Sequence, residues 1–223
     1  MRSVFRGLII IATMLLTWQG GLLSQHRVEV PCYYNVAVLS AQMLDKSMGL
    51  KETTGNNDGE HIKLYMKSVG LDYKKHYPYC MAGQYYYFKT AADLLHKPVP
   101  IARTASTIRI YEWAQENGIR TIYEAKENDL VVWKTLNESS GHVARIKQVL
   151  ERGNIYTWEC NTSNGLTGSQ REGNGNYIRK RNLFTPIGRM RIRGLIGLRY
   201  IYEYSQNTNI SPFANENKCS RHL

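Results

Sequence analysis

One cysteine of the sequence lies where a nucleophilic thiol could form. In "KKHYPYCMAGQYYYF" (residues 74–88), Cys80 follows a turn that contains Pro78 and precedes a run of aromatic residues that predicts a helix. At a helix start, free backbone N–H groups and the positive end of the helix dipole face the side chain, and both favour the nucleophilic thiolate. The alternative is a structural role for Cys80, as a small buried residue or as half of a disulfide.

A catalytic cysteine also needs a base, and the base needs a group that orients it. Among the six histidines, His142 has the best context, because it opens a predicted strand in "SSGHVARI", where Gly141 allows close backbone approach. His76 lies in the same turn as Cys80 and has no evident orienting partner. The turn "ERGN" folds "NIYTWECNT" back beside the strand of His142, which would bring Glu159 or Asn161 near the imidazole. A lone histidine is more often structural, so this neighbouring strand is what favours catalysis.

Three helices are predicted in the first part of the chain. The first is capped by Asn57 or Asp58 and ends at Gly70, the second runs from Cys80 to about residue 96, and the third runs from Thr107, after a Ser106 cap, to about Asn117. Along the second helix, apolar residues recur at steps of three and four, at Met81, Tyr85, Phe88, Ala92 and Leu95.

Beyond residue 128 the sequence changes to short segments rich in β-branched and aromatic residues. Turn-forming stretches separate "DLVVWK", "HVARIKQVL", "IYTWEC", "NYIRKR" and "LIGLRYIY", which predicts antiparallel strands. Helices followed by a run of strands indicate an α+β domain, with the helices packed on one side of the sheet.

The composition and the N-terminus bear on partners and location. Lysine and arginine outnumber aspartate and glutamate by 29 to 18, which favours an anionic partner such as nucleic acid, a membrane surface or a cell-wall polymer. Arg2 and Arg6 precede the uncharged residues 7–19, as in a signal peptide, and this stretch is short for a membrane-spanning helix. We expect a cleaved signal over an uncleaved anchor or a buried N-terminal helix, and export makes nucleic acid a less favoured partner.

The ordered set of motifs resembles the CHAP family, the cysteine, histidine-dependent amidohydrolases/peptidases of the papain-like, NlpC-type superfamily. The resemblance covers roughly residues 48–200 and rests on "YPYC", "ARTASTIRIYEWAQENG", "ENDLVVW", "GHVARI" and "ECNTSN". It implies a papain-like α+β fold for residues 27–204, between a signal peptide or N-terminal membrane anchor at 1–26 and a polar tail at 205–223.

The resemblance also implies roles for the candidate residues. Cys80 would be the nucleophile, His142 the general base and Glu159 the group that orients the imidazole, with Asn161 as an alternative or auxiliary orienting group. We expect no cofactor and no metal: the loop before Cys80 offers only Asp72 among lysines, and "GNNDGE" lacks the spacing of a calcium loop.

The remaining cysteines and the basic C-terminal half leave alternatives open. Cys160 could form an inhibitory disulfide with Cys80, although strand alternation points its side chain away, and Cys32 could pair with Cys219. Arginine and lysine dominate residues 171–199, either as solvated strand faces or as a surface attracted to an anionic wall or membrane.

The resemblance implies a cysteine amidase or peptidase that acts on peptidoglycan. Together with the signal-like N-terminus it predicts a secreted or periplasmic monomer that does not act on nucleic acid. The N-terminal segment could anchor it to the membrane. One alternative is a hydrolase of the same fold with an amide substrate outside the wall, and the other is a catalytically silent wall-binding module.

Overall fold

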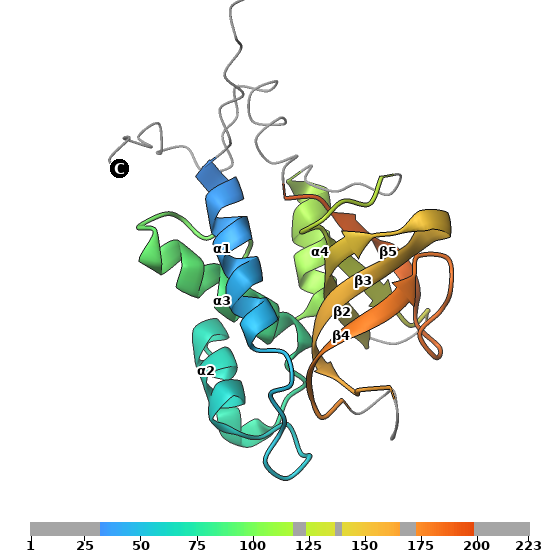
Figure 1. Cartoon of the computed structure of the whole chain (residues 1–223). Coiled ribbons are helices and arrows are strands. Elements are labelled where there is room, and N and C mark those ends of the chain that lie inside the picture. The colour runs from blue at the N-terminus through green and yellow to red at the C-terminus, as the bar shows by residue number, and fades with distance from the viewer. Residues whose placement is uncertain (1–31, 118–123, 137–139, 166–172, 199–223) are drawn as a thin grey trace, which may run out of the picture.

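The computed structural model describes residues 32–117, 124–136, 140–165 and 173–198. The predicted N-terminal signal, the polar tail and Cys219 lie outside these ranges. Four helices precede five strands (Figure 1): α1 Cys32–Lys46, α2 Glu60–Val69, α3 Cys80–Leu94, α4 Thr107–Glu116, β1 Leu130–Lys134, β2 Gly141–Val149, β3 Asn154–Thr162, β4 Gly175–Asn182 and β5 Arg191–Ile196. Single turns of 3-10 helix occur at Tyr73–Lys75 and Glu151–Gly153. None of the described helices is long and apolar enough to cross a membrane.

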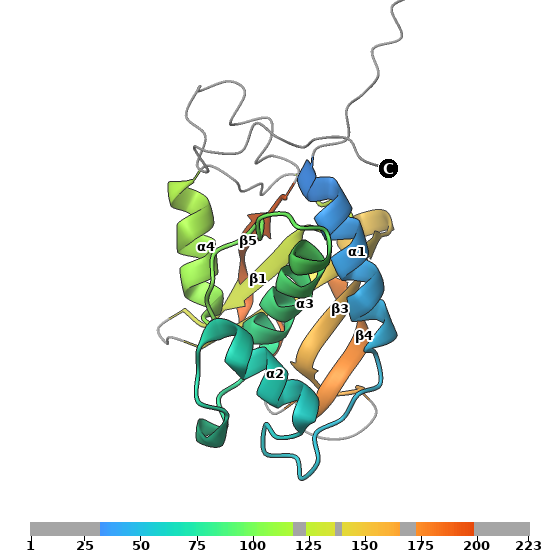
Figure 2. The same ribbon diagram turned by 90° about the vertical axis from the view of Figure 1, so that its left-hand side faces the viewer.

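The strands form one antiparallel sheet in the order β4-β3-β2-β1-β5. The helices gather on one face of this sheet, with α3 in the centre, where it contacts α1, α2, β2 and β3 (Figure 2). The predicted α+β class, with N-terminal helices packed on an antiparallel sheet, is confirmed.

The three predicted helices form close to their predicted bounds. The apolar stripe of α3 is buried, Gly70 ends α2 in a left-handed conformation with φ 77°, and the Ser106 hydroxyl caps α4 by accepting from the Arg109 N–H at 3.2 Å. The predicted cap of α2 is wrong. Gly59 occupies that position, and the Asp58 carboxylate instead accepts the Thr54 N–H at 2.8 Å.

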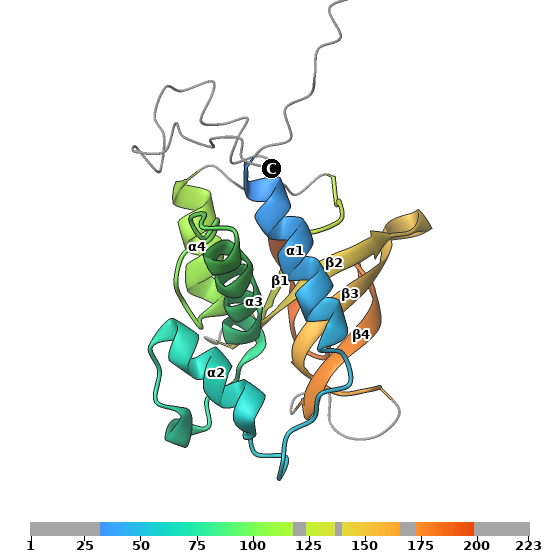
Figure 3. The ribbon, with the colours of Figure 1, turned by 60° about the vertical axis from the view of Figure 1, so that its left-hand side comes forward.

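Helix α1 was not predicted from the sequence, and a buried arginine explains its docking. Arg145 of β2 is fully buried and donates to the Ala37 carbonyl, to Ser40 Oγ at 2.8 Å and to Asn128 Oδ1 at 2.9 Å. Figure 3 shows α1 lying across the strands on the helix-bearing face. Small and polar residues of α1 thus take part in its docking beside the buried apolar residues Val36 and Leu44.

The fifth strand also differs from its prediction. It runs over Arg191–Ile196, whereas the sequence pattern predicts residues 195–202, of which 199–202 lie outside the described ranges. Arg191 and Ile192 pair with Lys134 and Trp133 of β1. The strand therefore begins within the arginine-rich residues before the apolar stretch, and apolar patterning alone does not detect this start.

Close packing between α3 and β3 sets the position of the start of α3. Gly83, one turn after Cys80, faces Cys160 of β3, and a Cβ at Gly83 would lie 2.6 Å from Cys160 Sγ and 2.8 Å from Cys160 Cβ. Both distances are shorter than van der Waals contact. The approach of the helix to the strand thus requires the absence of a side chain at position 83.

We expect Gly83→Ala to lower the free energy of unfolding by about 1–3 kcal/mol, because the added methyl overpacks the contact with Cys160. In a Cys160→Ala background the same change should cost much less, since the clashing sulfur is gone and alanine favours helix. Urea denaturation of the wild type, both single variants and the double variant gives the coupling energy. Additive effects of the two changes would show that the contact does not limit the packing.

Candidate active site

The cysteine predicted as nucleophile stands at the first residue of α3. Tyr79 precedes it as the N-cap, and the Tyr79 carbonyl accepts the Gly83 N–H at 2.8 Å, which starts the helix at this point. The Tyr79 side chain is buried and donates to Glu52 Oε1 at 3.1 Å. Cys80 is only 5% exposed, yet it lines a cavity of about 750 Å³. The thiol is therefore held rigidly at the edge of a space that can admit a ligand.

The start of β2 places His142 at the same cavity. The predicted close approach at Gly141 is present, since a Cβ there would lie 2.5 Å from Thr107 Oγ1 and 2.7 Å from the Trp133 carbonyl oxygen. This approach lets β2 begin directly beside β1 and the start of α4. His142 is buried, with its side chain 10% exposed.

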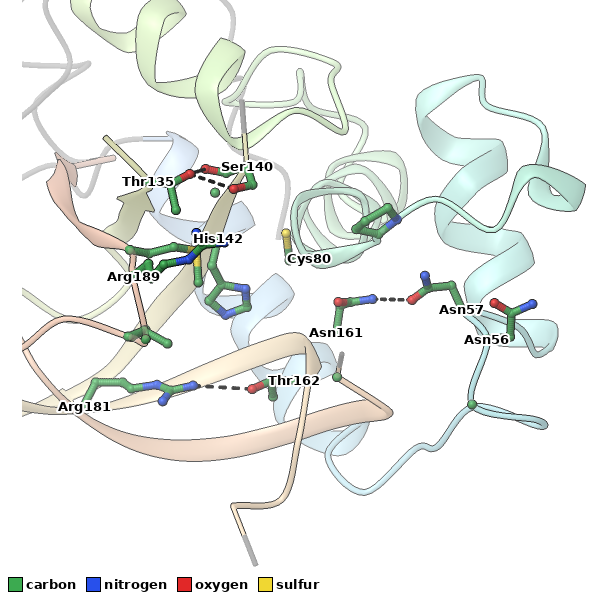
Figure 4. Close-up of a pocket in the computed structure, with 17 residues that line it drawn as sticks. Asn56, Asn57, Cys80, Thr135, Ser140, His142, Asn161, Thr162, Arg181 and Arg189 are labelled. Atoms are coloured by element: carbon green, nitrogen blue, oxygen red, sulfur yellow. Dashed lines mark hydrogen bonds between the residues drawn. The ribbon is translucent and has the colours of Figure 1, made fainter. Parts of the chain in front are cut away.

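The structure brings His142 and Glu159 together across the β2–β3 hairpin. His142 Nε2 lies 2.9 Å from Glu159 Oε2. With Nε2 occupied, Nδ1 is the ring nitrogen left for Cys80, whose side chain hydrogen-bonds the imidazole. Figure 4 shows the sulfur and the ring facing the same space. Thiol, imidazole and carboxylate thus form a chain in the order that nucleophile, base and orienting group require.

Glu159 is a fully buried carboxylate whose oxygens accept four hydrogen bonds. Oε1 accepts from Thr157 Oγ1 at 2.7 Å and Arg181 Nε at 2.8 Å, and Oε2 contacts Arg181 Nη2 at 2.8 Å as well as His142. Burial alone would raise the pKa of Glu159, but the bonds to Arg181 and His142 outweigh it and hold this pKa well below its usual range. The carboxylate is thus ionised and cannot rotate.

The same interactions act on the imidazole. Burial alone would lower the pKa of His142, whereas its hydrogen bonds to Cys80 and Glu159 raise this pKa from 6.5 to about 9. At neutral pH the imidazole is therefore protonated. An imidazolium beside a thiol stabilises the thiolate, the form that attacks a carbonyl carbon.

Arg181 is the main residue of the site that sequence reasoning missed. It belongs to β4, which lies beside β3. Its guanidinium donates two parallel hydrogen bonds to Glu159, and its side chain is only 11% exposed. In the sequence Arg181 is one of many basic residues between 171 and 199. The pairing of Arg181 with Glu159 can be recognised only once β3 and β4 are known to be neighbouring strands.

Asn161, the predicted alternative orienting group, lies at the cavity but hydrogen-bonds a different partner. Its Nδ2 donates to Asn57 Oδ1 at 2.6 Å, and no bond between Asn161 and His142 is present among the described residues. The backbone explains the difference: Asn161 has φ 54°, and the β3–β4 register shifts between Glu159 and Thr162. This irregularity turns the side chain out of the face that carries Glu159.

The other cysteines and possible metal ligands are also placed. Cys80 and Cys160 are both free thiols, and Cys160 is fully buried in the packing against α3, where burial raises the pKa of its thiol. The postulated bridge between them is therefore not formed in this structure. The described residues contain no group of three or more His, Cys, Asp or Glu side chains that could hold a metal ion.

We expect the pKa of His142 to be about 9, against an ordinary value of 6.5, and to fall in Cys80→Ala because one of the bonds to the imidazolium is lost. A raised pKa means that the stability contributed by His142 is complete below pH 6.5 and is lost as the pH rises through about 9. NMR titration of the imidazole in the wild type and the variant measures both values. Equal values in the two proteins would contradict the coupling to Cys80.

We expect Arg181→Met to lower the free energy of unfolding by about 3–5 kcal/mol, because it leaves a buried carboxylate without its cation. Glu159 stabilises the fold above its ordinary pKa of 4.5 and loses this contribution as the pH falls below it, so the variant should show a weaker dependence of stability on pH in this acid range.

Urea denaturation from pH 3 to 7 tests this prediction. Arg181→Lys keeps the charge but loses the planar fork and should be intermediate. Lys180→Met, at an exposed neighbouring position, serves as the matched control. Equal losses at positions 180 and 181 would show that the pair contributes nothing beyond surface charge.

Comparison with known proteins identifies a family whose model matches the part of the chain that contains the predicted site residues. The family model of the CHAP domain matches residues 72–161, a range that contains Cys80, His142, Glu159 and Asn161. CHAP domains are generally hydrolases of the amidase or peptidase type. No curated protein and no solved structure matches the chain. The resemblance to the CHAP family predicted from the sequence is thus confirmed over residues 72–161.

Proposed function

We propose that the protein is a peptidoglycan hydrolase that cleaves an amide bond through a cysteine acyl-enzyme. The observation that carries the proposal is the chain of contacts from Cys80 through His142 to the buried Glu159, in which Cys80 and His142 line one cavity. The CHAP match supports amide hydrolysis as the reaction class. The bond is either the N-acetylmuramoyl-L-alanine amide or a bond of the stem or cross-bridge peptide.

The proposed reaction uses the residues in sequence. The Cys80 thiolate attacks the carbonyl carbon of the amide and forms a tetrahedral oxyanion, for which the Cys80 N–H at the start of α3 is a donor. The His142 imidazolium gives its proton to the leaving nitrogen, and the C–N bond breaks to leave a thioester. The neutral imidazole then takes a proton from water, which attacks the thioester, and the thiolate is released. Glu159 keeps the imidazole oriented and balances its charge in each step.

The substrate and the location are part of the proposal. The excess of basic residues fits an anionic wall or membrane surface, and the uncharged residues 7–19 after Arg2 and Arg6 fit export to the compartment where peptidoglycan lies. We propose a secreted or periplasmic monomer, with residues 1–26 as a signal or an anchor.

We expect the purified protein to release fragments from isolated sacculi under reducing conditions, and Cys80→Ser to release at least about 1,000-fold less, because a serine hydroxyl at this site stays protonated. Mass spectrometry of the fragments identifies the cleaved bond by its new ends. Cys160→Ala is the matched control, since this thiol packs away from the cavity and its loss should leave most of the activity.

The alternatives predict different results. A hydrolase of another amide substrate would release nothing from sacculi of several wall types. Its Cys80 thiol would still be covalently modified by an alkylating analogue of an acyl substrate. A silent wall-binding module would bind sacculi equally well with and without Cys80. Fragment release that persists in Cys80→Ser would rule out the thiol mechanism.

A further inference from the structure

Two asparagines face each other at the cavity wall opposite the imidazole. Asn161 of β3 donates from Nδ2 to Asn57 Oδ1 at 2.6 Å, and Asn57 donates from Nδ2 to the His76 carbonyl oxygen at 2.9 Å. Asn57 lies in the loop before α2, and His76 lies in the turn that leads to Cys80. The pair therefore joins three separate segments of the chain around one side of the cavity.

The His76 carbonyl, which ends the series of hydrogen bonds from Asn161 through Asn57, determines the orientation of both side-chain amides. A carbonyl oxygen can only accept, so the Asn57 atom next to His76 must be the NH2 group. Asn57 then presents its oxygen to Asn161, and Asn161 must answer with its own NH2 group. The oxygen of Asn161 is left on the opposite side of its amide.

The loop that carries Asn57 is itself fixed. The Asn57 N–H donates to Glu52 Oε2 at 2.9 Å, and the other oxygen of the same carboxylate accepts from Tyr79, next to the nucleophile. Asn57 and Asn161 both adopt left-handed backbone conformations, with φ 50° and 54°, which asparagine tolerates better than most residues. Rotation of either amide would break a bond that this framework holds.

Figure 4 shows where the remaining oxygen points. The Asn161 oxygen turns toward the side of the cavity that holds Cys80 and His142, while its nitrogen turns toward Asn57. The described residues give this oxygen no hydrogen-bond partner. A polar acceptor of fixed direction thus faces the reaction space and is free for a ligand.

We propose that Asn161 determines specificity by accepting, through Oδ1, an N–H of the substrate beside the bond that is cleaved, and that Asn57 is the positioning residue that fixes this acceptor. The inference rests on the proposed amide hydrolysis. It assigns to Asn161 a contact with substrate in place of the orienting role predicted from the sequence. The ligand class is a substrate with a secondary amide, N–H intact, at this subsite.

The chemistry of the amide supports this assignment. The N–H concerned belongs to an amide beside the scissile one, so its acceptor is a group separate from the donors that receive the oxyanion. An acceptor oxygen would repel the oxyanion, which excludes Asn161 from the oxyanion site. A subsite built to accept a hydrogen bond discriminates against analogues that lack the donor, because the acceptor, once covered by the ligand, is left without a partner.

The test uses substrates in which one hydrogen-bond donor is removed without added bulk. Once the cleaved bond is identified, two synthetic muropeptides are made. In each, the scissile amide is unchanged and one neighbouring amide, on one side of the scissile bond or on the other, is replaced by an ester. We expect one of the two ester analogues to be cleaved by the wild type with kcat/KM about tenfold below that of the all-amide parent. In Asn161→Gly this ratio should fall to about one, since glycine keeps the left-handed backbone and removes the acceptor.

Asn57→Gly tests the positioning role, because it frees the Asn161 amide to rotate while both backbones are kept. We expect the ester ratio in this variant to lie between those of the wild type and Asn161→Gly. A merely structural role for either asparagine would slow parent and analogue alike and leave the ratio at its wild-type value, which would overturn the inference. Equal cleavage of the parent and both analogues by the wild type would also overturn it and leave the proposed function intact. A wild type that cleaves no muropeptide would defeat both.

Discussion

The buried carboxylate of Glu159 is the constraint on which the rest of the site depends. Removing an ion from water costs several kcal/mol unless partners compensate it, and Glu159 has no exposed surface. Its four hydrogen bonds come from side chains on β2, β3 and β4, so the charge can be accommodated only when these strands are correctly paired. The geometry of the imidazole is thereby tied to the geometry of the sheet.

The packing of α3 on the sheet places the Cys80 thiol beside His142 and Glu159. Gly83 lets α3 approach Cys160 of β3, and residue 80, one turn earlier, is then carried to the start of β2, where His142 lies. The loops on the other side act in the same way, since the Glu52 carboxylate binds both Tyr79 and the loop of Asn57. Sheet, helix and loop each contribute one wall of the cavity, and each is positioned by a contact of its own.

The parts of this arrangement that could be predicted from the sequence are those with a local signal. The helix start at Cys80, the strand start at Gly141-His142 and the hairpin that returns Glu159 are each encoded within a few residues, and their spacing resembles the CHAP family. Arg181 and Asn57 have no such signal. Their partners lie 22 and 104 residues away, and their meeting depends on the sheet order and on the path of a long loop. Asn161 was found by its spacing, but the direction of its side chain depends on a backbone irregularity that the sequence does not reveal.

The dependence of Arg181 on strand order also changes how the basic residues between 171 and 199 should be interpreted. Treated as a set, they predict either solvated strand faces or an anion-attracting surface, and both interpretations place all the charges outside. In the structure Arg181 faces inward to neutralise Glu159, and the Arg193 guanidinium lies 5.3 Å from the centre of the Tyr111 ring. Part of the positive charge thus serves to hold the site and the α4 packing together. Because buried ion pairs are screened by salt far less than exposed charges, added salt should weaken attraction to an anionic surface while leaving the Glu159–Arg181 pair intact.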